Sequence, residues 1–424
     1  MSADPSASWR ALWSAFGRIG LLSFGGPAAQ IALMHQVLVE ERRWLDEPRF
    51  LNALNFCMLL PGPEAMQLAT YCGWMLRGVA GGVLAGLLFV VPGLAVMLAL
   101  ASVAALHGDV PWIEGFLFGL KASVLAVVVF AILRLARKAL GTHWQWTLAV
   151  LAFLALFVFA VPFPFVIAAA GLVGWWMAGE TAPDRSAAPP RDHSHVARTA
   201  LLWLAVWAAP FALIVATAGV GSLWWDEATF FSLAAIVTFG GAYAVLAYVA
   251  QAAVETYGWL APGEMATGLG LAESTPGPLI LVLVFVGFQG AYGMPGGLDP
   301  LVAGLLGGAL AAWVTFAPCF LWVFLGAPYV ERLRGGRFAS ALTGVSAAIV
   351  GVIANLAAWF AIQVLFARTV RIDRGPFDMA LPAGEPVWAA IAIAGASILL
   401  MARGMSMLLV LALAGVAGSL LAML

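Results

Sequence analysis

Two Pro-Gly-Pro triplets, Pro61-Gly62-Pro63 and Pro276-Gly277-Pro278, interrupt long apolar runs of this sequence. Proline lacks an amide hydrogen and restricts the residue before it, so each triplet predicts a break between two half-helices. A half-helix that begins after such a break directs its unpaired N–H groups and the positive end of its dipole at the break. This arrangement suits a small, doubly charged anion with a tetrahedral set of oxygens.

Polar side chains flank both triplets. Gln67, Ser274 and Thr275 could donate hydrogen bonds to the oxygens of an anion, although each serves equally well to tie neighbouring helices together. Glu64 directly follows the first triplet, and Glu273 lies just before the second. These acids could carry a coupling proton, stay neutral as hydrogen-bond donors or pair with a cation, and the sequence leaves the three roles open.

A single lysine, Lys121, lies well inside the apolar run of residues 112–133. A charge at that depth of a membrane is costly unless it is paired or hydrated, so such residues commonly serve function. We interpret Lys121 as a fixed positive counter-charge for the anion. The alternative is a side chain that reaches toward the membrane surface or forms a structural ion pair.

The turn Phe24-Gly25-Gly26-Pro27, preceded by Ser23, would let the backbone approach a ligand closely. A glycine pair in a membrane helix can also serve only the close packing of helices. The pair recurs as Gly240-Gly241 at the matched position of the second half of the chain. Because of this recurrence, we favour a substrate-binding role for both pairs.

The composition of the 424 residues indicates an all-α polytopic membrane protein. Hydrophobic residues make up 63% and charged residues only 10%, against roughly 25% charged residues in a soluble domain. At about 20 apolar residues per crossing, the chain offers roughly ten to thirteen membrane segments. A net charge of -1 argues against a nucleic-acid partner, and the three cysteines lack the spacing of a metal site. We expect no cofactor and no bound metal.

The two halves of the sequence repeat one another. Phe24 corresponds to Phe239 and Pro61 to Pro276 at one constant offset, which lengthens downstream, where Pro92 corresponds to Pro318. The added residues fall in the loop around 292–299. We therefore predict two tandem homologous repeats at 1–178 and 199–424, joined by a polar linker at 179–198.

The basic residues predict that the two repeats have opposite orientations in the membrane. The loop 40–49 contains three arginines, whereas its counterpart 255–264 contains no lysine or arginine. The bias reverses further along, where the loop 107–111 has no lysine or arginine and its counterpart 329–338 has three arginines. The basic loop 368–374 is the exception. If the first arginines and Arg77 are all cytoplasmic, the segment 50–76 must enter and leave on one side as a re-entrant hairpin.

Three motifs of the first half together resemble the chromate ion transporter family. They are Phe24-Gly25-Gly26-Pro27, the loop ending Glu41-Arg42-Arg43-Trp44-Leu45, and Leu59-Leu60-Pro61-Gly62-Pro63. The matched second copy resembles the two-domain members of that family. The resemblance covers nearly the whole chain apart from the linker and the C-terminal tail. The second copy departs from the first, with Ala242 in place of Pro27 and no counterpart of the two arginines.

The resemblance implies a transporter, not an enzyme, that exports chromate across the inner membrane of a prokaryote, with sulfate as a related anion. Arg42 and Arg43 could concentrate the anion at the cytoplasmic mouth or gate it, although they serve equally well as topology determinants. A transporter of sulfate or another oxyanion, a membrane-embedded lipid enzyme and a non-transporting membrane subunit are the alternatives. The sequence contains no H-E-x-x-H, G-x-S-x-G or nucleotide-binding loop. It leaves a homodimer open.

Overall fold

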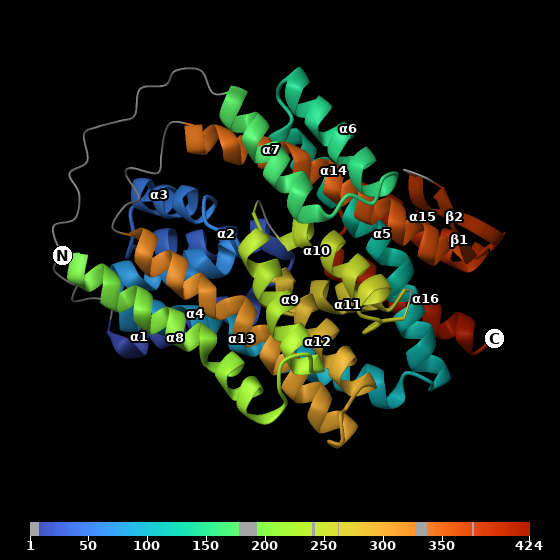
Figure 1. The fold of residues 1–424 in the computed structure, drawn as a ribbon, viewed down its shortest axis with the longest axis horizontal. Helices are drawn as coiled ribbons and strands as arrows, with labels where there is room; N and C mark the ends of the chain where they lie inside the picture. The colour runs from blue at the N-terminus through green and yellow to red at the C-terminus, as the bar shows by residue number, and fades with distance from the viewer. Residues whose placement is uncertain (1–7, 178–192, 240–241, 262, 328–336, 375–376) are drawn as a thin grey trace. The chain divides into compact units, whose positions relative to one another are not determined.

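The computed structural model describes residues 8–177, 193–239, 242–261, 263–327, 337–374 and 377–424 (Figure 1). The first half contains α1 (Trp9–Leu22), α2 (Gly26–His35), η1 (Gln36–Glu41), α3 (Glu47–Cys57), α4 (Glu64–His107), α5 (Pro111–Ala139), α6 (His143–Phe157) and α7 (Phe163–Met177). The second half contains α8 (His193–Thr217), α9 (Leu223–Val237), α10 (Ala242–Gln251), η2 (Ala252–Thr256), α11 (Glu264–Glu273), η3 (Leu279–Leu281), α12 (Val282–Gly293), α13 (Pro300–Gly326), α14 (Arg337–Leu365), β1 (Phe366–Arg374), β2 (Phe377–Pro386), α15 (Trp388–Ala402) and α16 (Met407–Ala422).

The helices confirm the prediction of a helical, polytopic membrane protein. Among the described residues, five helices are long and apolar enough to cross a membrane, namely α4, α5, α13, α8 from Val196 and α14 from Ala339. Six shorter apolar helices accompany them. The β1–β2 hairpin is an addition that the sequence did not predict.

Both Pro-Gly-Pro triplets lie between helices. In the first half, α3 ends at Cys57 and α4 begins at Glu64; in the second, α11 ends at Glu273 and the next helical turn begins at Leu279. The helices that precede the triplets, α3 with 11 residues and α11 with 10, are only half the length needed to cross a bilayer. Their length fits the predicted half-helices.

Helix α4 consists of two arms. Its 44 residues would extend about 66 Å, twice the thickness of a membrane core, if they formed one straight helix. The backbone leaves helical geometry at Arg77 and Gly78, and Gly78 adopts a positive φ of 64°. A Cβ atom on Gly73 would lie 2.4 Å from the carbonyl oxygen of Gly81, so the two arms fold back on each other.

The second half builds the same pair of arms as two separate helices. Gly287 of α12 and Gly307 of α13 make the equivalent close approach, and a Cβ on Gly287 would lie 2.8 Å from the carbonyl oxygen of Gly307. The connection between the two helices is the loop 294–299. The extra residues that lengthen the offset between the halves therefore fall where the sequence placed them.

The two halves also share an unusual turn before their half-helices. The π-helical turns η1 and η2 end alike, with the Arg42 amide donating to the Val37 carbonyl and the Tyr257 amide to the Ala252 carbonyl. Two residues later, Trp44 and Trp259 close the turns with matched backbone hydrogen bonds. All these pairs stand at the same offset as the two Pro-Gly-Pro triplets, so the repeat is visible in local structure.

The chain forms two compact units, and each draws on both halves of the sequence. Unit 1 comprises residues 1–99, 180–242 and 275–339, and unit 2 comprises residues 100–179, 243–274 and 340–424. The predicted repeats therefore do not correspond to separate compact bodies. Their boundaries at 178 and 199 stay a prediction, and most of the predicted linker lies outside the described residues.

Unit 1 is organised around α13, which packs against α12, α9 and α8 (Figure 1). Aromatic contacts link α8 to α13, where Trp203 stacks on Phe320 with ring centroids 4.9 Å apart. The side chain of Trp313 donates a hydrogen bond of 2.9 Å to the Val206 carbonyl, again between these two helices. The first half joins this core through α4, since a Cβ on Gly86 would lie 2.7 Å from the Phe320 ring.

Unit 2 is organised around α5, which packs against α16, α15 and α11. Small residues allow the helices to approach closely, since a Cβ on Gly119 of α5 would lie 1.9 Å from the Ala414 carbonyl oxygen of α16. Gly351 of α14 makes a similar approach to Ala149 of α6. These contacts again join the first half of the chain to the second.

Candidate functional site

The predicted site residues are divided between the two units. Unit 1 contains Ser23, Gly25, Gly26, Arg42, Arg43, both Pro-Gly-Pro triplets, Glu64, Gln67 and Thr275. Unit 2 contains Lys121, Glu273 and Ser274. Gly240 and Gly241 lie outside the described residues.

The first break is held by the second half of the chain. Gly62 adopts a φ of 117°, which only glycine adopts readily, and its N–H donates a hydrogen bond of 2.7 Å to the carbonyl oxygen of Thr238. The buried side chain of Gln67 turns back from the first turn of α4, and its Nε2 donates to the Pro61 carbonyl at 2.6 Å. Both bonds satisfy backbone groups that the break frees.

The second break is held by the first half. Gly277, with a φ of 94°, donates its N–H to the carbonyl oxygen of Ser23 at 2.9 Å. The amide of Gln30, in α2, donates to the Gly277 carbonyl at 2.6 Å. Ser23 thus takes part through its backbone, while its hydroxyl donates to the Ile19 carbonyl in its own helix.

The two breaks form a reciprocal pair. Ser23 and Thr238, whose carbonyl oxygens accept these bonds, occupy matched positions of the two halves, as do Gly62 and Gly277. The Thr238 hydroxyl donates to the Ala234 carbonyl just as the Ser23 hydroxyl donates to that of Ile19. Sequence reasoning missed Thr238, although its position directly before Phe239 matches that of Ser23 before Phe24.

The glutamines break the symmetry of the pair. Gln30 and Gln67 both come from the first half, and the residues at the matched positions of the second half are Val245 and Val282. The first half therefore supplies the side-chain amide at both breaks. Sequence reasoning identified Gln67 but missed Gln30, because a single glutamine among the apolar residues of a helix carries no signal of a contact 247 residues away.

Glycines begin the first helix that faces this region. Gly25 and Gly26 have φ values of 88° and 76°, and α2 begins at Gly26 with Pro27 in its first turn.

Glu64 is the first residue of α4 and half-buried. A carboxylate at a helix N-terminus interacts favourably with the dipole, so Glu64 in its ionised form competes with any anion for this end of α4.

In unit 2, Lys121 lies on α5 beside the start of α11. A Cβ on Gly263 would lie 3.9 Å from its Nζ, and the acids that act on it electrostatically are Glu264 and Glu114. Glu264 also accepts a hydrogen bond of 2.6 Å from the Ala261 amide, which caps α11. Lys121 is therefore placed near carboxylates as well as near a helix N-terminus.

The other end of α11 carries the second predicted acid. The Tyr243 hydroxyl donates a hydrogen bond to Glu273, and Arg134 acts on the same carboxyl group electrostatically. The Ser274 hydroxyl donates to the Leu271 carbonyl at 2.9 Å and so closes the helix. Tyr243 and Arg134 are partners that sequence reasoning missed.

Arg43 occupies a strained backbone position. Its φ is 53°, and the matching residue of the second half is Gly258 with a φ of 64°. A left-handed conformation costs a non-glycine residue about 1–2 kcal/mol. Its neighbour Arg42 lies 5.7 Å from the centre of the Trp44 ring, which orients that guanidinium group.

Because the backbone at Arg43 is strained, a glycine there can remove the positive charge without damaging the fold, which tests whether that charge is needed for transport. We expect Arg43→Gly to raise the unfolding free energy by about 1 kcal/mol, because glycine relieves the strained φ. The change removes the positive charge without disturbing the turn. Thermal unfolding in detergent checks the stability. Chromate uptake by vesicles then reports the charge alone, with Arg43→Lys as the control that keeps the charge; equal uptake by both variants would exclude a role in attracting the anion.

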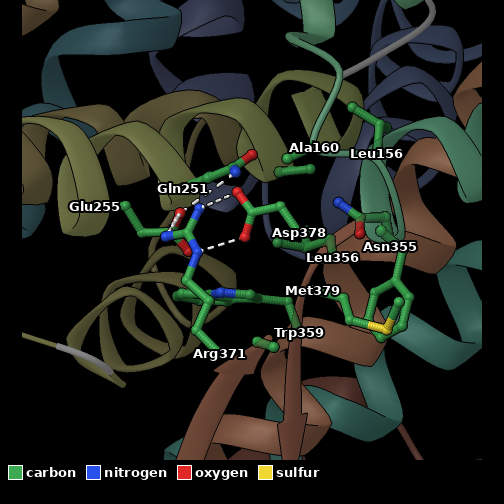
Figure 2. Close-up of a pocket in the computed structure, with 13 residues that line it drawn as sticks. Leu156, Ala160, Gln251, Glu255, Asn355, Leu356, Trp359, Arg371, Asp378 and Met379 are labelled. Carbon is green, nitrogen blue, oxygen red and sulfur yellow. Dashed lines mark hydrogen bonds and ion pairs between the residues drawn. The ribbon is translucent and has the colours of Figure 1, made fainter. Parts of the chain in front are cut away.

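A polar cluster on the hairpin of unit 2 was not predicted. Figure 2 shows Arg371 of β1 lying between Asp378 of β2 and Glu255 of η2. Its guanidinium group donates to the Asp378 carboxylate at 2.5 and 2.6 Å and to Glu255 at 3.1 Å. The Asp378 amide donates to the Val158 carbonyl at 2.9 Å, so the hairpin is fastened to the α6–α7 connection as well.

The Arg371 cluster makes the hairpin sensitive to acid. The hydrogen bonds from Arg371 hold the pKa of Asp378 below its ordinary value. A lowered pKa stabilises the hairpin at neutral pH, and that stabilisation is lost as the pH falls through the aspartate range. Because the pair is partly exposed, we expect Arg371→Ala to cost the hairpin about 1 kcal/mol at most.

Hydrogen exchange of the β1 and β2 amides at pH 7 measures this loss. The Arg371→Ala variant should have lower protection factors at pH 7, and its protection factors, taken relative to the intrinsic exchange rate at each pH, should fall less than those of the unchanged protein when the pH is lowered to about 4. Arg368→Ala, on the same strand, is the matched control. Equal exchange in all three proteins would show that the cluster does not hold the hairpin.

The fold and the paired breaks define a helical membrane protein built from two repeats with interrupted helices, a design typical of secondary transporters. The sequence profile of the Chromate transporter family matches residues 10–175 and again residues 225–419. The chain belongs to this family. The matches fall one in each half, which agrees with the tandem repeat.

Curated relatives with known names cover most of the chain. A probable chromate transport protein of Synechococcus elongatus is 29% identical over 84% of this chain and 85% of its own. A chromate transport protein of Cupriavidus metallidurans is 29% identical over 86% and 84%, and one of Pseudomonas aeruginosa is 33% identical over 83% and 81%. No solved structure matches the chain.

Proposed function

We propose that this protein exports chromate across the inner membrane by alternating access at the paired helix breaks of unit 1. The reciprocal bonding of Gly62 and Gly277 is the observation that carries the proposal. Gly62 and Gly277 are buried, and each break is fixed by the other half of the chain and adjacent to the N-terminal end of a helix. Interrupted backbone of this kind persists in membranes only where it is enclosed by protein or lines a cavity.

The helix ends supply the attraction for the anion. The N–H groups in the first turns of α2 and α4 and the positive ends of the two helix dipoles favour a negatively charged ligand. Glu64 opposes that attraction when it is ionised. Among the roles that the sequence left open, we therefore assign Glu64 that of a neutral hydrogen-bond donor, whose proton stays on the protein through the transport cycle.

The membrane potential supplies the direction of transport. With the cell interior negative, each elementary charge that leaves gains about 2.3 kcal/mol per 100 mV. An anion that binds from the cytoplasm is thus driven outward. In the proposed cycle the two repeats rearrange about the breaks, so that the site opens first to the cytoplasm and then to the outside.

Uptake of labelled chromate into inverted membrane vesicles tests the proposal. We expect uptake that depends on the protein and grows with a potential that is positive inside the vesicle. Labelled sulfate is measured in parallel, since it is the related tetrahedral dianion. Uptake of sulfate alone would replace chromate by sulfate as the substrate, and uptake of neither anion would exclude both.

A further inference from the structure

Two glutamine side chains at the breaks present buried acceptor atoms. Gln30 and Gln67 are 1% and 0% exposed. Their Nε2 atoms donate to the carbonyl oxygens of Gly277 and Pro61, both at 2.6 Å. Among the described residues, neither Oε1 atom has a hydrogen-bond donor.

The orientation of both amides is fixed by their surroundings. Turning either amide over would place its oxygen against a carbonyl oxygen at hydrogen-bond distance, which is repulsive. The free atom of each side chain is therefore an acceptor and not a donor. A buried acceptor without a donor is unfavourable, so something that donates a hydrogen bond is expected beside it.

A threonine adds a third unpartnered group near the first break. Thr315 of α13 is 1% exposed, and its hydroxyl has no partner among the described residues. It lies one helical turn before Cys319 and so on the same face of α13. Cys319 faces the break, because a Cβ on Gly62 would lie 2.9 Å from its Sγ atom and equally close to the Gln67 amide nitrogen.

These groups have opposite preferences for a ligand. The starts of α2 and α4 attract negative charge. The Oε1 atoms repel an oxyanion that carries no hydrogen, since lone pairs would face lone pairs. An anion with one O–H group satisfies both demands, because it remains negatively charged and donates a hydrogen bond to an acceptor.

We propose that the site takes the singly protonated form of its oxyanion, hydrogen chromate, whose O–H donates to the Oε1 atom of Gln67 or Gln30. This inference rests on the proposed function. It also supplies a basis for selecting chromate over sulfate. Hydrogen chromate is abundant near neutral pH, whereas sulfate is a much weaker base and is almost wholly unprotonated there.

Counting the charges moved per anion tests the inference in the unchanged protein. At equal pH on both sides and a potential of about 30 mV, a monoanion accumulates about 3-fold in inverted vesicles and a dianion about 10-fold. We expect the 3-fold ratio. With no potential and an alkaline lumen, labelled chromate should accumulate in the lumen. A 10-fold ratio, without a response to the pH gradient, would overturn the inference while leaving chromate export intact.

Labelled sulfate separates a proton carried by the substrate from one carried by the protein. A protein-borne proton would move sulfate together with a proton, whereas a site that requires an O–H on its ligand excludes sulfate. We expect no accumulation of sulfate under conditions where chromate accumulates. Accumulation of both anions would overturn the inference, and absence of chromate accumulation would refute the proposed function as well.

Variants of Gln67 assign the acceptor. Gln67→Met removes it and should raise the KM for chromate about 10-fold or more, whereas Gln67→Glu, protonated in this buried position, keeps both a donor for the Pro61 carbonyl and an acceptor for the ligand. We expect Gln67→Glu to restore the KM and the 3-fold ratio. If the Gln67→Met protein keeps the KM for chromate of the unchanged protein and still excludes sulfate, the assignment of Gln67 as the acceptor is wrong.

Discussion

Replacing Gly93 by alanine is expected to abolish most of the transport. Gly93 lies on the second arm of α4, and a Cβ there would lie 2.0 Å from the Pro276 carbonyl oxygen, which belongs to the second break. Backbone cannot yield as a flexible side chain does, so either the arm or the break must move. Overpacking of this kind costs about 1–3 kcal/mol, and we expect chromate uptake by vesicles to fall about 10-fold or more.

Gly17→Ala provides the matched control. Gly17 is also a helical glycine, in α1, but no heavy atom lies within 4 Å of the position of a Cβ there. Alanine is a better helix former than glycine by about 1 kcal/mol, so this variant should unfold at the same temperature or higher and transport normally. Normal uptake by Gly93→Ala as well would show that function does not need the arm and the second break to stay in contact.

Replacing Lys121 by methionine is the second change with a large expected effect. Methionine keeps the length of the side chain but removes the charge that we interpret from the sequence as a counter-charge for the anion, so this variant tests that interpretation. We expect chromate uptake to fall about 10-fold or more, because the anion would be left without a partner charge, which is strongly unfavourable in a buried position. Lys121→Arg keeps the positive charge and should restore the uptake. Initial rates of uptake, with and without an imposed potential, measure the effect.

Glu264→Gln distinguishes the counter-charge from a structural ion pair. If Lys121 only balances Glu264, removal of either charge should lower the thermal stability and spare the initial rate per folded molecule. If Lys121 serves the anion, Glu264→Gln should transport normally. Lys138→Ala, at the last turn of the same helix, controls for a general loss of positive charge on α5.

The features that depend on neighbouring residues could be predicted from the sequence. The half-helices follow from the fixed φ and missing amide of the prolines, and the site of the extra loop follows from the change of offset between Gly78 and Gly304. The inverted orientation of the repeats stays a prediction. Local chemistry acts over one or two turns, and a sequence shows it directly.

The contacts that complete the breaks could not be predicted in the same way. The Gln30 amide reaches a carbonyl 247 residues away, and Thr238 contributes only a backbone oxygen, so its side chain gives no signal. Thr315 resembles any small polar residue in an apolar helix. Such contacts arise from packing between elements, which no short pattern in one sequence encodes.

The hairpin was missed for a different reason. Its arginines were interpreted as topology signals in a basic loop, whereas Arg371 lies between the β-branched residues Val370 and Ile372 in a paired strand. Arg371 is satisfied by two carboxylates. The basic segment 368–374, which disagreed with the predicted inverted pattern, is therefore a paired strand with an ion-paired arginine and not a simple basic loop.

The reciprocal bonds also determine the order in which the two breaks can be completed during synthesis of the chain. The Gly62 amide is synthesised long before the Thr238 carbonyl that receives its hydrogen bond. At about 5–20 residues per second, the ribosome leaves that amide without its final partner for roughly 10–35 s. The first half must therefore enter the membrane with its break open to water or to the insertion machinery, and it closes only when the second half arrives.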